Sequence, residues 1–475
     1  MLLSKILPNF SAHLSDMEIT GISCNSKDVK NGYAFVCIQG TNVDGHNYAL
    51  DAINNGAAVV VTQRDLGIEN QIIVSDTHVV YATMCANWFD NPAKDLRLIG
   101  VTGTNGKTSV TYMLKSVLEN SGSKVGLIGT IQNMIGDEAV VSHNTTPNAY
   151  ELNSLFSLMR AKGCEFVIME VSSHALDQCR VYDLKFDVAI FTNLTQDHLD
   201  YHKTMENYLN AKKKLFNMCG TAVVNKDDAY YEQLVQGLGC EIITCSTDND
   251  SIYSAKAIKY RPDGVDYELV SDISFNHISV KTGGKFTVYN SMLVAVTALK
   301  MGIEMDIITK SLQELEGIKG RAEVVPNDRD FTIIIDYAHT PDGLKNILST
   351  FRECEKERLI VLFGCGGDRD RTKRPKMGNI AVHNADYVIV TSDNPRSEEP
   401  MAIIDDILEG TQGVKTPVKV IENRIEAIKY AVSIARRGDI LVLAGKGHET
   451  YQILKSGTIH LDEREIIKEA LAELS

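Results

Sequence analysis

The residues between an apolar run, RLIGVT, and a helical pattern, SVTYML, are the first candidates for chemistry. Gly103 and Gly106 allow backbone N–H groups to approach a phosphate, and the N-terminus of the following helix favours negative charge. Lys107 can reach the outer phosphates of a nucleotide, and the hydroxyl of Thr108 can bind Mg²⁺. The loop lacks the first glycine of the G-x-x-x-x-G-K-[ST] pattern. It still predicts a phosphate site, and the alternative is an ordinary glycine-rich turn with a surface lysine.

Acidic and histidine side chains follow two further apolar runs. Glu170 ends the run FVIME, and the stretch NLTQDHLDYH contains Asp197, His198 and His202. Carboxylate oxygens suit Mg²⁺, which is a hard cation. From spacing alone, Glu170 could also be the polar end of a strand, and the NLTQDHLDYH stretch could be a proton relay or the polar start of a helix. Beside a nucleotide loop, Mg²⁺ is a better interpretation than zinc.

Basic residues gather in the segment GCGGDRDRTKRPKMG and in the motif DNPR. In an acidic chain they predict a local site for an anion, and the planar fork of arginine suits a carboxylate. The alternative is a set of surface salt bridges. Three consecutive lysines at 212–214 are, taken alone, typical of a solvated helix face. The basic segment and the motif contain Arg369, Arg371, Lys373, Arg374, Lys376, Asn394 and Arg396.

The composition excludes several classes of protein. A chain of 475 residues is too long for one hydrophobic core, so two to four domains are expected. The net charge of −14 argues against a nucleic-acid-binding surface. No apolar run approaches the roughly 20 residues of a membrane span, and we expect no signal peptide. Ten scattered cysteines without a C-x-x-C pair predict reduced thiols in a cytoplasmic protein.

The elements that must position these motifs fall into three blocks. The first has short strand-like runs, and residues 92–97 read as a linker to the second. In the second and third, wholly apolar runs alternate with helical stretches, which predicts doubly wound α/β domains with parallel sheets covered on both faces. Residues 317–330 read as the boundary between them. Because ligands bind beyond the carboxyl ends of such strands, two facing sheet edges would form one cleft.

The order of the motifs resembles the Mur ligase family over essentially the whole chain. The motifs that carry the resemblance are TGTNGKT, TTPN, EVSSHAL, NLTQDHLDYH, the AK of NAKKKLF, GGKFTVYN, GRAE, DYAHTP, GCGGDRDRTKRP, DNPR and GKGHE. The resemblance implies three α/β domains. They are an N-terminal UDP-muramoyl-binding domain at 1–88, a central P-loop-type ATPase domain at 89–322, and a C-terminal Rossmann-like, amino-acid-binding domain at 323–475.

The resemblance also implies a reaction. It is the ATP-dependent addition of meso-2,6-diaminopimelate to UDP-N-acetylmuramoyl-L-alanyl-D-glutamate through an acyl phosphate, in peptidoglycan precursor synthesis. Mg²⁺ would be the cofactor, and a monomer without nucleic-acid or membrane partners is expected. Four alternatives are weighed. The L-lysine-adding ligase of the same fold is disfavoured by DNPR, and a related ligase that adds glutamate to folate is disfavoured by the N-terminal block. The other two are a nucleotide-driven ATPase or binding protein without a ligase step and a metal-dependent hydrolase.

The resemblance assigns roles to residues at the matching motif positions. Nucleotide contacts are expected from Gly103, Thr104, Asn105, Gly106, Lys107, Thr108, Ser109, Asn290, Arg321 and Asp336. Catalytic or metal-binding roles are expected for Lys107, Thr108, Glu170, His198 and Lys212, the last as a CO₂-derived carbamate. The muramoyl-peptide would contact Ser26, Thr145, Thr146, Ser172, Gln178 and Arg180. Diaminopimelate would contact Arg369, Asp393, Asn394, Pro395, Arg396, Gly445 and Glu449.

The chain departs from the family pattern at two places. The motif that is usually D-S-R reads Asn25-Ser26-Lys27, which retains the serine and changes both neighbours. Thr287 stands in GGKFTVYN where asparagine is usual. The first departure affects contacts on the uridine side, and the second is minor.

Overall fold

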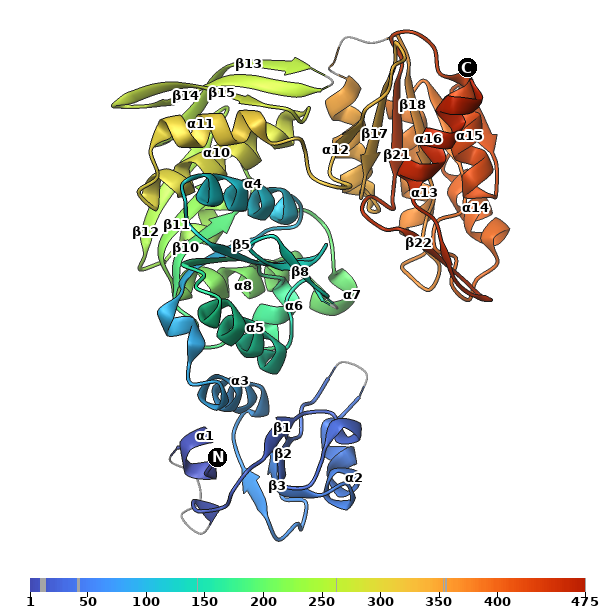
Figure 1. The fold of residues 1–475 in the computed structure, drawn as a ribbon. Coiled ribbons are helices and arrows are strands. Elements are labelled where there is room, and N and C mark those ends of the chain that lie inside the picture. The colour runs from blue at the N-terminus through green and yellow to red at the C-terminus, as the bar shows by residue number, and fades with distance from the viewer. Residues whose placement is uncertain are drawn as a thin grey trace.

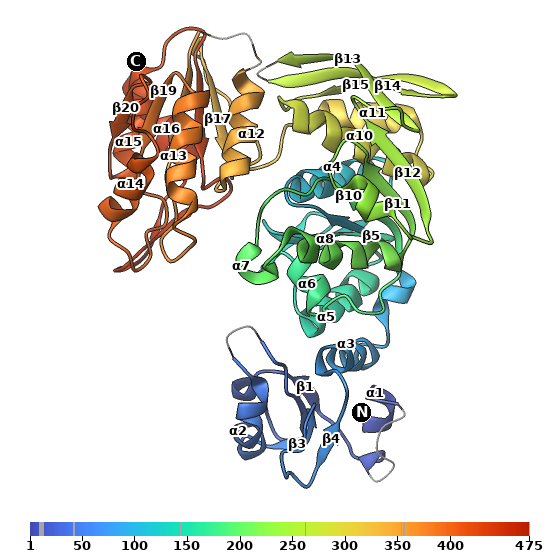
Figure 2. The same cartoon turned by 180° about the vertical axis from the view of Figure 1, so that it is seen from behind.

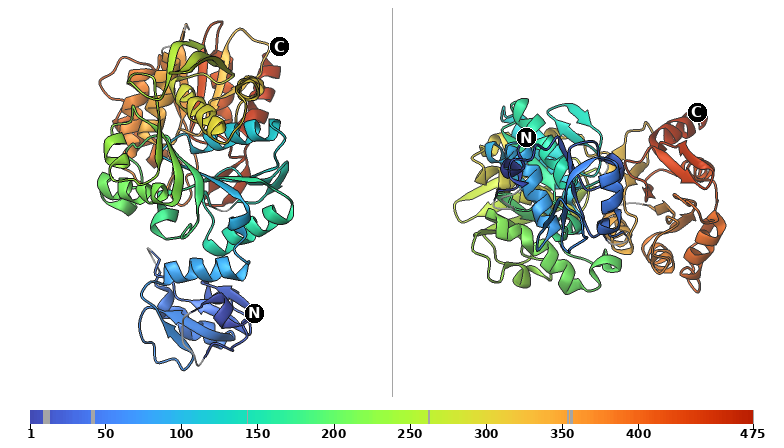
Figure 3. Two further views of the ribbon diagram at one scale, coloured as in Figure 1. Left: turned by 90° about the vertical axis from the view of Figure 1, so that its left-hand side faces the viewer. Right: turned by 90° about the horizontal axis from the view of Figure 1, so that it is seen from below.

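The computed structural model describes residues 1–8, 14–40, 43–142, 144–261, 263–352, 354 and 357–474. Figure 1 shows three bodies in chain order, coloured blue, teal to yellow, and orange to red, with the first and last on different sides of the central one. The two views in Figure 3 agree with this arrangement. Within the described residues, no helix combines the length and the apolar character that crossing a bilayer requires.

The N-terminal body is a small parallel sheet with strand order β1-β2-β3-β4. Its strands are β1 (Gly21–Ser23), β2 (Tyr33–Val36), β3 (Ala57–Thr62) and β4 (Gln71–Ile73). Its helices are α1 (Leu3–Ile6), α2 (Ala49–Asn54) and α3 (Thr77–Trp88). Asp76 caps α3 by accepting hydrogen bonds from the backbone of His78 and Val79. Helix α3 lies between this body and the central one (Figure 1).

The central body is built on a sheet with strand order β15-β14-β13-β12-β11-β10-β5-β9-β6-β7-β8. Strands from β6 to β13 in this order run parallel, whereas β7, β8, β14 and β15 add antiparallel edges. The strands are β5 (Arg97–Thr102), β6 (Val125–Ile128), β7 (Asn133–Ile135), β8 (Glu138–Val140), β9 (Phe166–Glu170), β10 (Phe186–Phe191), β11 (Cys219–Asn225), β12 (Glu241–Ser246), β13 (Tyr253–Arg261), β14 (Gly264–Ser271) and β15 (Ser274–Val280).

Helices cover both faces of the central sheet (Figures 1 and 2). One face carries α4 (Lys107–Asn120), α10 (Lys285–Lys300) and α11 (Met305–Glu314). The other carries α5 (Ala149–Ala161), α6 (Ser173–Asp177), α8 (Met205–Lys213) and α9 (Tyr231–Val235), and the short α7 (Leu199–His202) precedes α8. Strand β9 is buried along its whole length, because a sheet covered on both faces leaves no side of a central strand in water.

The C-terminal body has a six-stranded sheet with order β16-β17-β21-β18-β19-β20, in which only β16 is antiparallel. Its strands are β16 (Glu323–Val325), β17 (Thr332–Asp336), β18 (Leu359–Phe363), β19 (Tyr387–Val390), β20 (Val418–Val420) and β21 (Ile440–Ala444), and a hairpin adds β22 (Tyr451–Leu454) and β23 (Gly457–His460). One face is covered by α12 (Pro341–Arg352), α13 (Lys373–Asn384) and α14 (Pro400–Glu409). The opposite face is covered by α15 (Arg424–Ile434) and α16 (Glu463–Glu473).

The doubly wound α/β prediction is confirmed for the second and third bodies. The antiparallel strands at the edges were not predicted, because β7 and β8 are short and the strands β13 to β15 expose one face, so neither gives a wholly apolar run. The phosphate loop, Glu170, the DNPR motif and the GKGHE motif each lie at or just after the end of a parallel strand. The carboxyl ends of these strands therefore set the positions of the candidate residues.

A buried ion pair holds α15 against α16 beneath the C-terminal sheet edge. The guanidinium of Arg424 lies 2.7 Å from the carboxylate of Glu463, and neither side chain is exposed. Arg424 also donates to the carbonyl oxygens of Ser392, two residues after β19, and of Ala444, the last residue of β21.

Glu463→Gln would leave the Arg424 guanidinium buried without its anion. We expect the free energy of unfolding of the C-terminal body to fall by about 3–5 kcal/mol, as is usual when one partner of a buried pair is removed. Thermal unfolding followed by calorimetry measures this. Lys429→Gln, which breaks a pair with Glu473 on the outside of the same two helices, is the matched control and should leave the unfolding temperature unchanged. Equal stability of the two variants would contradict the prediction.

Candidate active site between the central and C-terminal sheets

The loop between β5 and α4 is closely packed at two glycines. Gly103 has φ +150°, and a Cβ atom there would lie 1.9 Å from Oγ1 of Thr192. Gly106 has φ +88°, and its Cβ would lie 2.6 Å from Oδ1 of Asn290. Any larger residue would therefore be both strained and obstructed. The backbone of this turn stays open to a ligand at the N-terminus of α4, where a phosphate is favoured.

Two lysines share one backbone acceptor in this loop. Nζ of Lys107 donates to the carbonyl oxygens of Gly103, at 2.9 Å, and Thr104, at 2.8 Å. Nζ of Lys212, from α8, donates to the same Gly103 oxygen at 2.8 Å. Burial lowers the pKa of both amines, and the neighbouring Lys107 lowers the pKa of Lys212 further. The Lys212 amine therefore favours its neutral form.

The structure corrects the interpretation of the lysine run as a solvated face. Lys212 is 1% exposed, and its amine lies over the ring of Tyr208 at 4.5 Å. Lys213 is half-buried, and Lys214 is exposed and pairs with Asp177. Helix α8 thus turns only the first of the three toward the phosphate loop.

Glu170 is fully buried at the end of β9 and faces the same space. Its Oε1 accepts from the backbone N–H of Thr130 at 2.9 Å, and its Oε2 accepts from the Thr130 hydroxyl, also at 2.9 Å. The Thr130 hydroxyl also contacts that of Thr145 at 3.0 Å. No ion pair between described residues involves Glu170. Hydrogen bonds from one threonine therefore fix the orientation of this carboxylate.

His198 is the N-cap residue before α7 and lies in the left-handed region, with φ 54°. Partial desolvation lowers the pKa of His198 to about 4, although its side chain is 46% exposed and Asp197 opposes the shift. The imidazole is then neutral at physiological pH, which is the form that binds a metal. The rings of His198 and His174 lie 4.9 Å apart, edge to face.

These groups fit a magnesium ion whose coordination shell is completed by water and substrate. Among the described residues, no three His, Cys, Asp or Glu side chains form a cluster that could hold a metal. Mg²⁺ does not need such a cluster, because it usually takes one or two carboxylates together with water and substrate phosphates. Glu170 supplies a carboxylate, His198 a neutral imidazole and Thr108 a hydroxyl.

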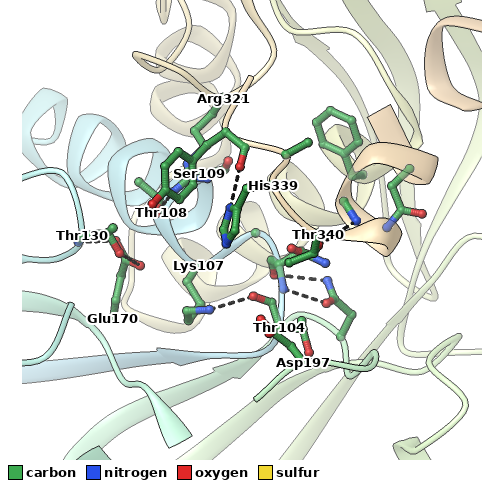
Figure 4. A pocket seen from close by; sticks show the side chains of 18 of the residues that line it. Thr104, Lys107, Thr108, Ser109, Thr130, Glu170, Asp197, Arg321, His339 and Thr340 are labelled. Carbon is green, nitrogen blue, oxygen red and sulfur yellow. Dashed lines mark hydrogen bonds between the residues drawn. The ribbon is translucent and has the colours of Figure 1, made fainter. Parts of the chain in front are cut away.

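The C-terminal body contributes the opposite wall. Arg321 donates from Nη2 to the hydroxyl of Thr108 at 3.1 Å, and its guanidinium lies over the Tyr337 ring at 4.8 Å. Asp336 accepts from the backbone N–H groups of Ala322 and Ala338 and so ties the junction to the end of β17. Figure 4 shows Lys107 and Glu170 on one side of the pocket, with Arg321 and His339 opposite.

One cavity of about 370 Å³ collects most of the expected nucleotide and metal residues. Gly103 adjoins it through its carbonyl oxygen. The expected residues that line it are Thr104, Asn105, Gly106, Lys107, Thr108, Ser109, Thr145, Glu170, Ser172, His198, Lys212, Asn290, Arg321 and Asp336. The cavity is also lined by residues for which no role was predicted, among them Thr130, Tyr208, Phe286, Tyr337, His339, Thr340 and Asn346. Tyr337, His339 and Thr340 lie within the DYAHTP motif, which could have identified them.

A second cavity, of about 200 Å³, lies between the N-terminal and central bodies. Gln178 and Arg180 line it, as do Cys24, His78 and Tyr81 from the N-terminal body. Oε1 of Gln178 accepts hydrogen bonds from both Nε and Nη2 of Arg180. Nη1 of Arg180 donates to the carbonyl oxygen of Thr146. These hydrogen bonds bring three of the expected muramoyl-peptide residues, Thr146, Gln178 and Arg180, together.

Ser26 stands apart from that group. It is buried in a short 3₁₀ turn, and its carbonyl oxygen accepts from the side chain of Asn55. It lines neither of the two cavities.

The residues expected to bind the amino acid form their own group at the carboxyl edge of the C-terminal sheet. Nδ2 of Asn394 donates to Glu449 at 2.9 Å, and Nη1 of Arg396 donates to the carbonyl oxygen of Gly367 at 2.8 Å. Arg396 has φ 53°, and its backbone N–H donates to Ile453 of β22. These residues do not line the nucleotide cavity.

The basic segment is less open to an anion than its sequence suggests. Arg374 is fully buried and pairs with Glu398 and Asp406, and Arg371 pairs with Glu398. Lys373 donates to the carbonyl oxygen of His339. Among the described residues, neither Lys373 nor Arg369 has a carboxylate partner, and Arg369 is exposed. The charges of this segment mostly stabilise the loop rather than form a general anion site.

Three models of one protein family match consecutive parts of the chain. The model described as "Mur ligase family, catalytic domain" matches residues 18–93. "Mur ligase middle domain" matches 101–298, and "Mur ligase, glutamate ligase domain" matches 320–447.

Curated proteins with similar sequences carry one name. A protein of Caldanaerobacter subterraneus subsp. tengcongensis is 46% identical over 463 residues, and one of Clostridium botulinum is 45% identical over 465 residues. Each alignment covers 96% of both chains. Both are named UDP-N-acetylmuramoyl-L-alanyl-D-glutamate--2,6-diaminopimelate ligase.

Solved structures agree in fold. A structure of a ligase with the same name has a TM-score of 0.74 at 31% identity, covering 100% of this chain and 99% of that one. The MurF ligase of Thermotoga maritima in complex with ADP has a TM-score of 0.65 at 18% identity, covering 97% of this chain and 99% of that one, and shows the fold alone. With these matches over nearly its whole length, the chain belongs to the Mur ligase family.

Proposed function

We propose that the chain is an ATP-dependent ligase that joins meso-2,6-diaminopimelate to UDP-N-acetylmuramoyl-L-alanyl-D-glutamate in peptidoglycan precursor synthesis. The observation that carries the proposal is the shared cavity, where Lys107 and Glu170 from the central sheet face Asp336 and Tyr337 from the C-terminal sheet. The names of relatives that are 45–46% identical support the choice of substrates. The scattered cysteines, none of which forms a C-x-x-C pair in the sequence, support action in the cytoplasm, and we expect a monomer.

ATP would place its phosphates on the β5–α4 loop, with its base toward Asn290. The backbone N–H groups at the start of α4 would hold the phosphates, and Lys107 would leave its bonds to Gly103 and Thr104 to reach them. Arg321, which already bonds Thr108, brings a second positive charge from the domain junction. Mg²⁺, held by Glu170, His198 and Thr108, would neutralise phosphate charge when bound.

The first chemical step makes the substrate carboxylate reactive. The D-glutamyl side-chain carboxylate attacks the γ-phosphorus, the bond to the β-phosphate oxygen breaks, and an acyl phosphate and ADP result. The D-glutamyl carboxylate and the γ-phosphate are both anions and must approach each other. Positive charge from Lys107 on the nucleotide side and Arg180 on the muramoyl-peptide side would lower the barrier to this step. Thr145 and Ser172 line the cavity from the muramoyl-peptide side.

The second step forms the amide. The amine of diaminopimelate attacks the acyl carbon, a tetrahedral intermediate forms, and it expels phosphate as the nitrogen loses a proton. The acyl phosphate must be kept from water until then, and this requires the C-terminal body to bring its amino-acid group over the cavity. The contact between Asn105 and Asp342 already links the two walls.

Lys212 would act as an anion rather than as a cation. Its buried, neutral amine can add to the carbon of CO₂ and release a proton, which gives an N-carboxylate. This carboxylate would stand beside the phosphate loop and add an oxygen ligand for a metal ion.

The amino-acid choice would depend on Arg396 and Asn394. Among the described residues, Nε and Nη2 of Arg396 have no hydrogen-bond partner, so this side of the guanidinium is open to a carboxylate. Diaminopimelate carries a distal carboxylate that lysine lacks. With lysine bound, the guanidinium would be left without its anion.

Omitting each substrate in turn tests the proposed function. We expect phosphate release only when ATP, UDP-N-acetylmuramoyl-L-alanyl-D-glutamate and meso-diaminopimelate are all present, because the phosphoryl acceptor and the amine come from the last two. A coupled phosphate assay measures the rate. Release with ATP alone would indicate an ATPase switch instead, and equal rates with L-lysine would indicate the lysine-adding ligase.

Arg396→Ala should lower kcat/KM for meso-diaminopimelate by about 100-fold or more, the usual effect of removing one charged partner. The unaltered chain should prefer diaminopimelate over lysine by about 10⁴-fold, and the variant should lose most of that preference. Steady-state kinetics with both amino acids measure this. Arg437→Ala, at a nearly fully exposed position in the same body, is the control. An unchanged preference in Arg396→Ala would refute the assignment.

Lys212→Ala should reduce turnover by at least about 100-fold, since a preorganised charge beside the phosphates is lost. Added formate or acetate should restore part of the activity, because a small carboxylate can take the place of the carbamate. Lys213→Ala, at the neighbouring half-buried position, serves as the control and should remain active. A fully active Lys212→Ala variant would exclude the role.

A further inference from the structure

Lys446 lies behind the amino-acid group and has no assigned role. It follows β21 in the GKGHE motif, and its side chain is completely buried. Its Nζ donates to Oε2 of Glu449 at 2.8 Å and to Oδ1 of Asn394 at 3.2 Å. One buried cation therefore bonds two residues that come from the loops after different strands, β19 and β21.

The contacts of Asn394 fix the direction of its amide. Oδ1 accepts from Lys446 and also from the backbone N–H of Ile453, at 2.9 Å. Nδ2 donates one of its two hydrogens to Glu449. With both lone pairs of Oδ1 taken, Asn394 can offer a ligand only the second hydrogen of Nδ2. The amide is therefore preset as a donor, which suits a carboxylate.

The contacts of Glu449 leave it as an acceptor. Its Oε2 accepts from Lys446 and Asn394, whereas its Oε1 has no partner among the described residues. The side chain is 13% exposed, so the free oxygen lies in a largely desolvated place. It suits an ammonium group. Lys446 balances the charge of Glu449, which would otherwise repel a ligand carboxylate held by Asn394 and Arg396.

We propose that Lys446 is the positioning residue that sets the polarity of the amino-acid subsite. It holds Asn394 as a donor and Glu449 as a charge-balanced acceptor, so that together they bind a carboxylate and an ammonium group carried by one carbon. This inference rests on the proposed function only in naming diaminopimelate as the ligand with such a second end. The recognition itself applies to any amino acid that presents both groups there.

Lys446→Met keeps the length of the side chain and removes its charge. The KM for meso-diaminopimelate should rise about 10- to 100-fold, the range for losing a hydrogen bond to a charged group, while kcat changes less than about threefold. The KM values for ATP and the UDP-linked substrate should not change. Lys455→Met, an exposed lysine on the β22–β23 hairpin, is the matched control and should behave like the unaltered chain.

A second pair of variants separates positioning from a general loss of structure. Glu449→Gln removes the partner charge with little change in volume and should also raise the KM for diaminopimelate. If Lys446 acts through Glu449, the KM for diaminopimelate in the double variant Lys446→Met/Glu449→Gln should rise about as much as in the more impaired single variant. Independent roles would instead multiply the two increases. This comparison holds even if Lys446→Met is less stable, because Glu449→Gln supplies an independent reference.

Two results would overturn the inference. One is a KM for diaminopimelate in Lys446→Met that stays within about twofold of the unaltered value. The other is an equal rise of KM for all three substrates, which would indicate a structural role. The proposed function fails separately, if the unaltered chain does not turn over diaminopimelate. The same KM comparison is then made with the amino acid that it does use.

Discussion

The carbonyl oxygen of Gly103 is the point on which the nucleotide site depends. It accepts from Lys107, at the start of α4, and from Lys212, on α8, so two buried amines meet at one backbone atom. This is possible because the loop carries no side chain at Gly103 or Gly106, where a Cβ atom would collide with Thr192 or Asn290. Burial lowers the pKa of both lysines, and the charge of Lys107 lowers that of Lys212 further, which shifts Lys212 toward its neutral form.

The C-terminal body also buries charged side chains, and it stabilises them with ion pairs. Its loops at the sheet edge are rich in charge, and buried ion pairs stabilise them from within. Arg374 binds Glu398, Arg424 binds Glu463, and Lys446 binds Glu449. Arg396 keeps an open side because these other cations already have partners. A buried charge without a partner is costly, so the open groups at this edge are the ones that we expect a ligand to neutralise.

The junction between the two sheets joins these halves. Arg321 reaches back to Thr108, and Asp336 accepts from the backbone N–H groups of Ala322 and Ala338, which follow Arg321 and Tyr337. The nucleotide cavity therefore has walls from both bodies, while the amino-acid group lies along the same edge of the C-terminal sheet but outside the cavity. We therefore expect a reaction that uses both sites to require movement of one body relative to the other.

The sequence by itself determined the α/β class and the parallel central strands, because wholly apolar runs alternating with helical patterns have few other solutions. It also placed the phosphate loop, since glycine spacing and a following helix are local features. Its predictions for the individual binding residues remain predictions. Only the tertiary structure decided which lysine of 212–214 faces inward, which arginines of 369–374 are already paired, and that Thr130 orients Glu170. The physical reason is that burial and pairing depend on contacts between segments far apart in the chain, and a local pattern of residue types does not contain them.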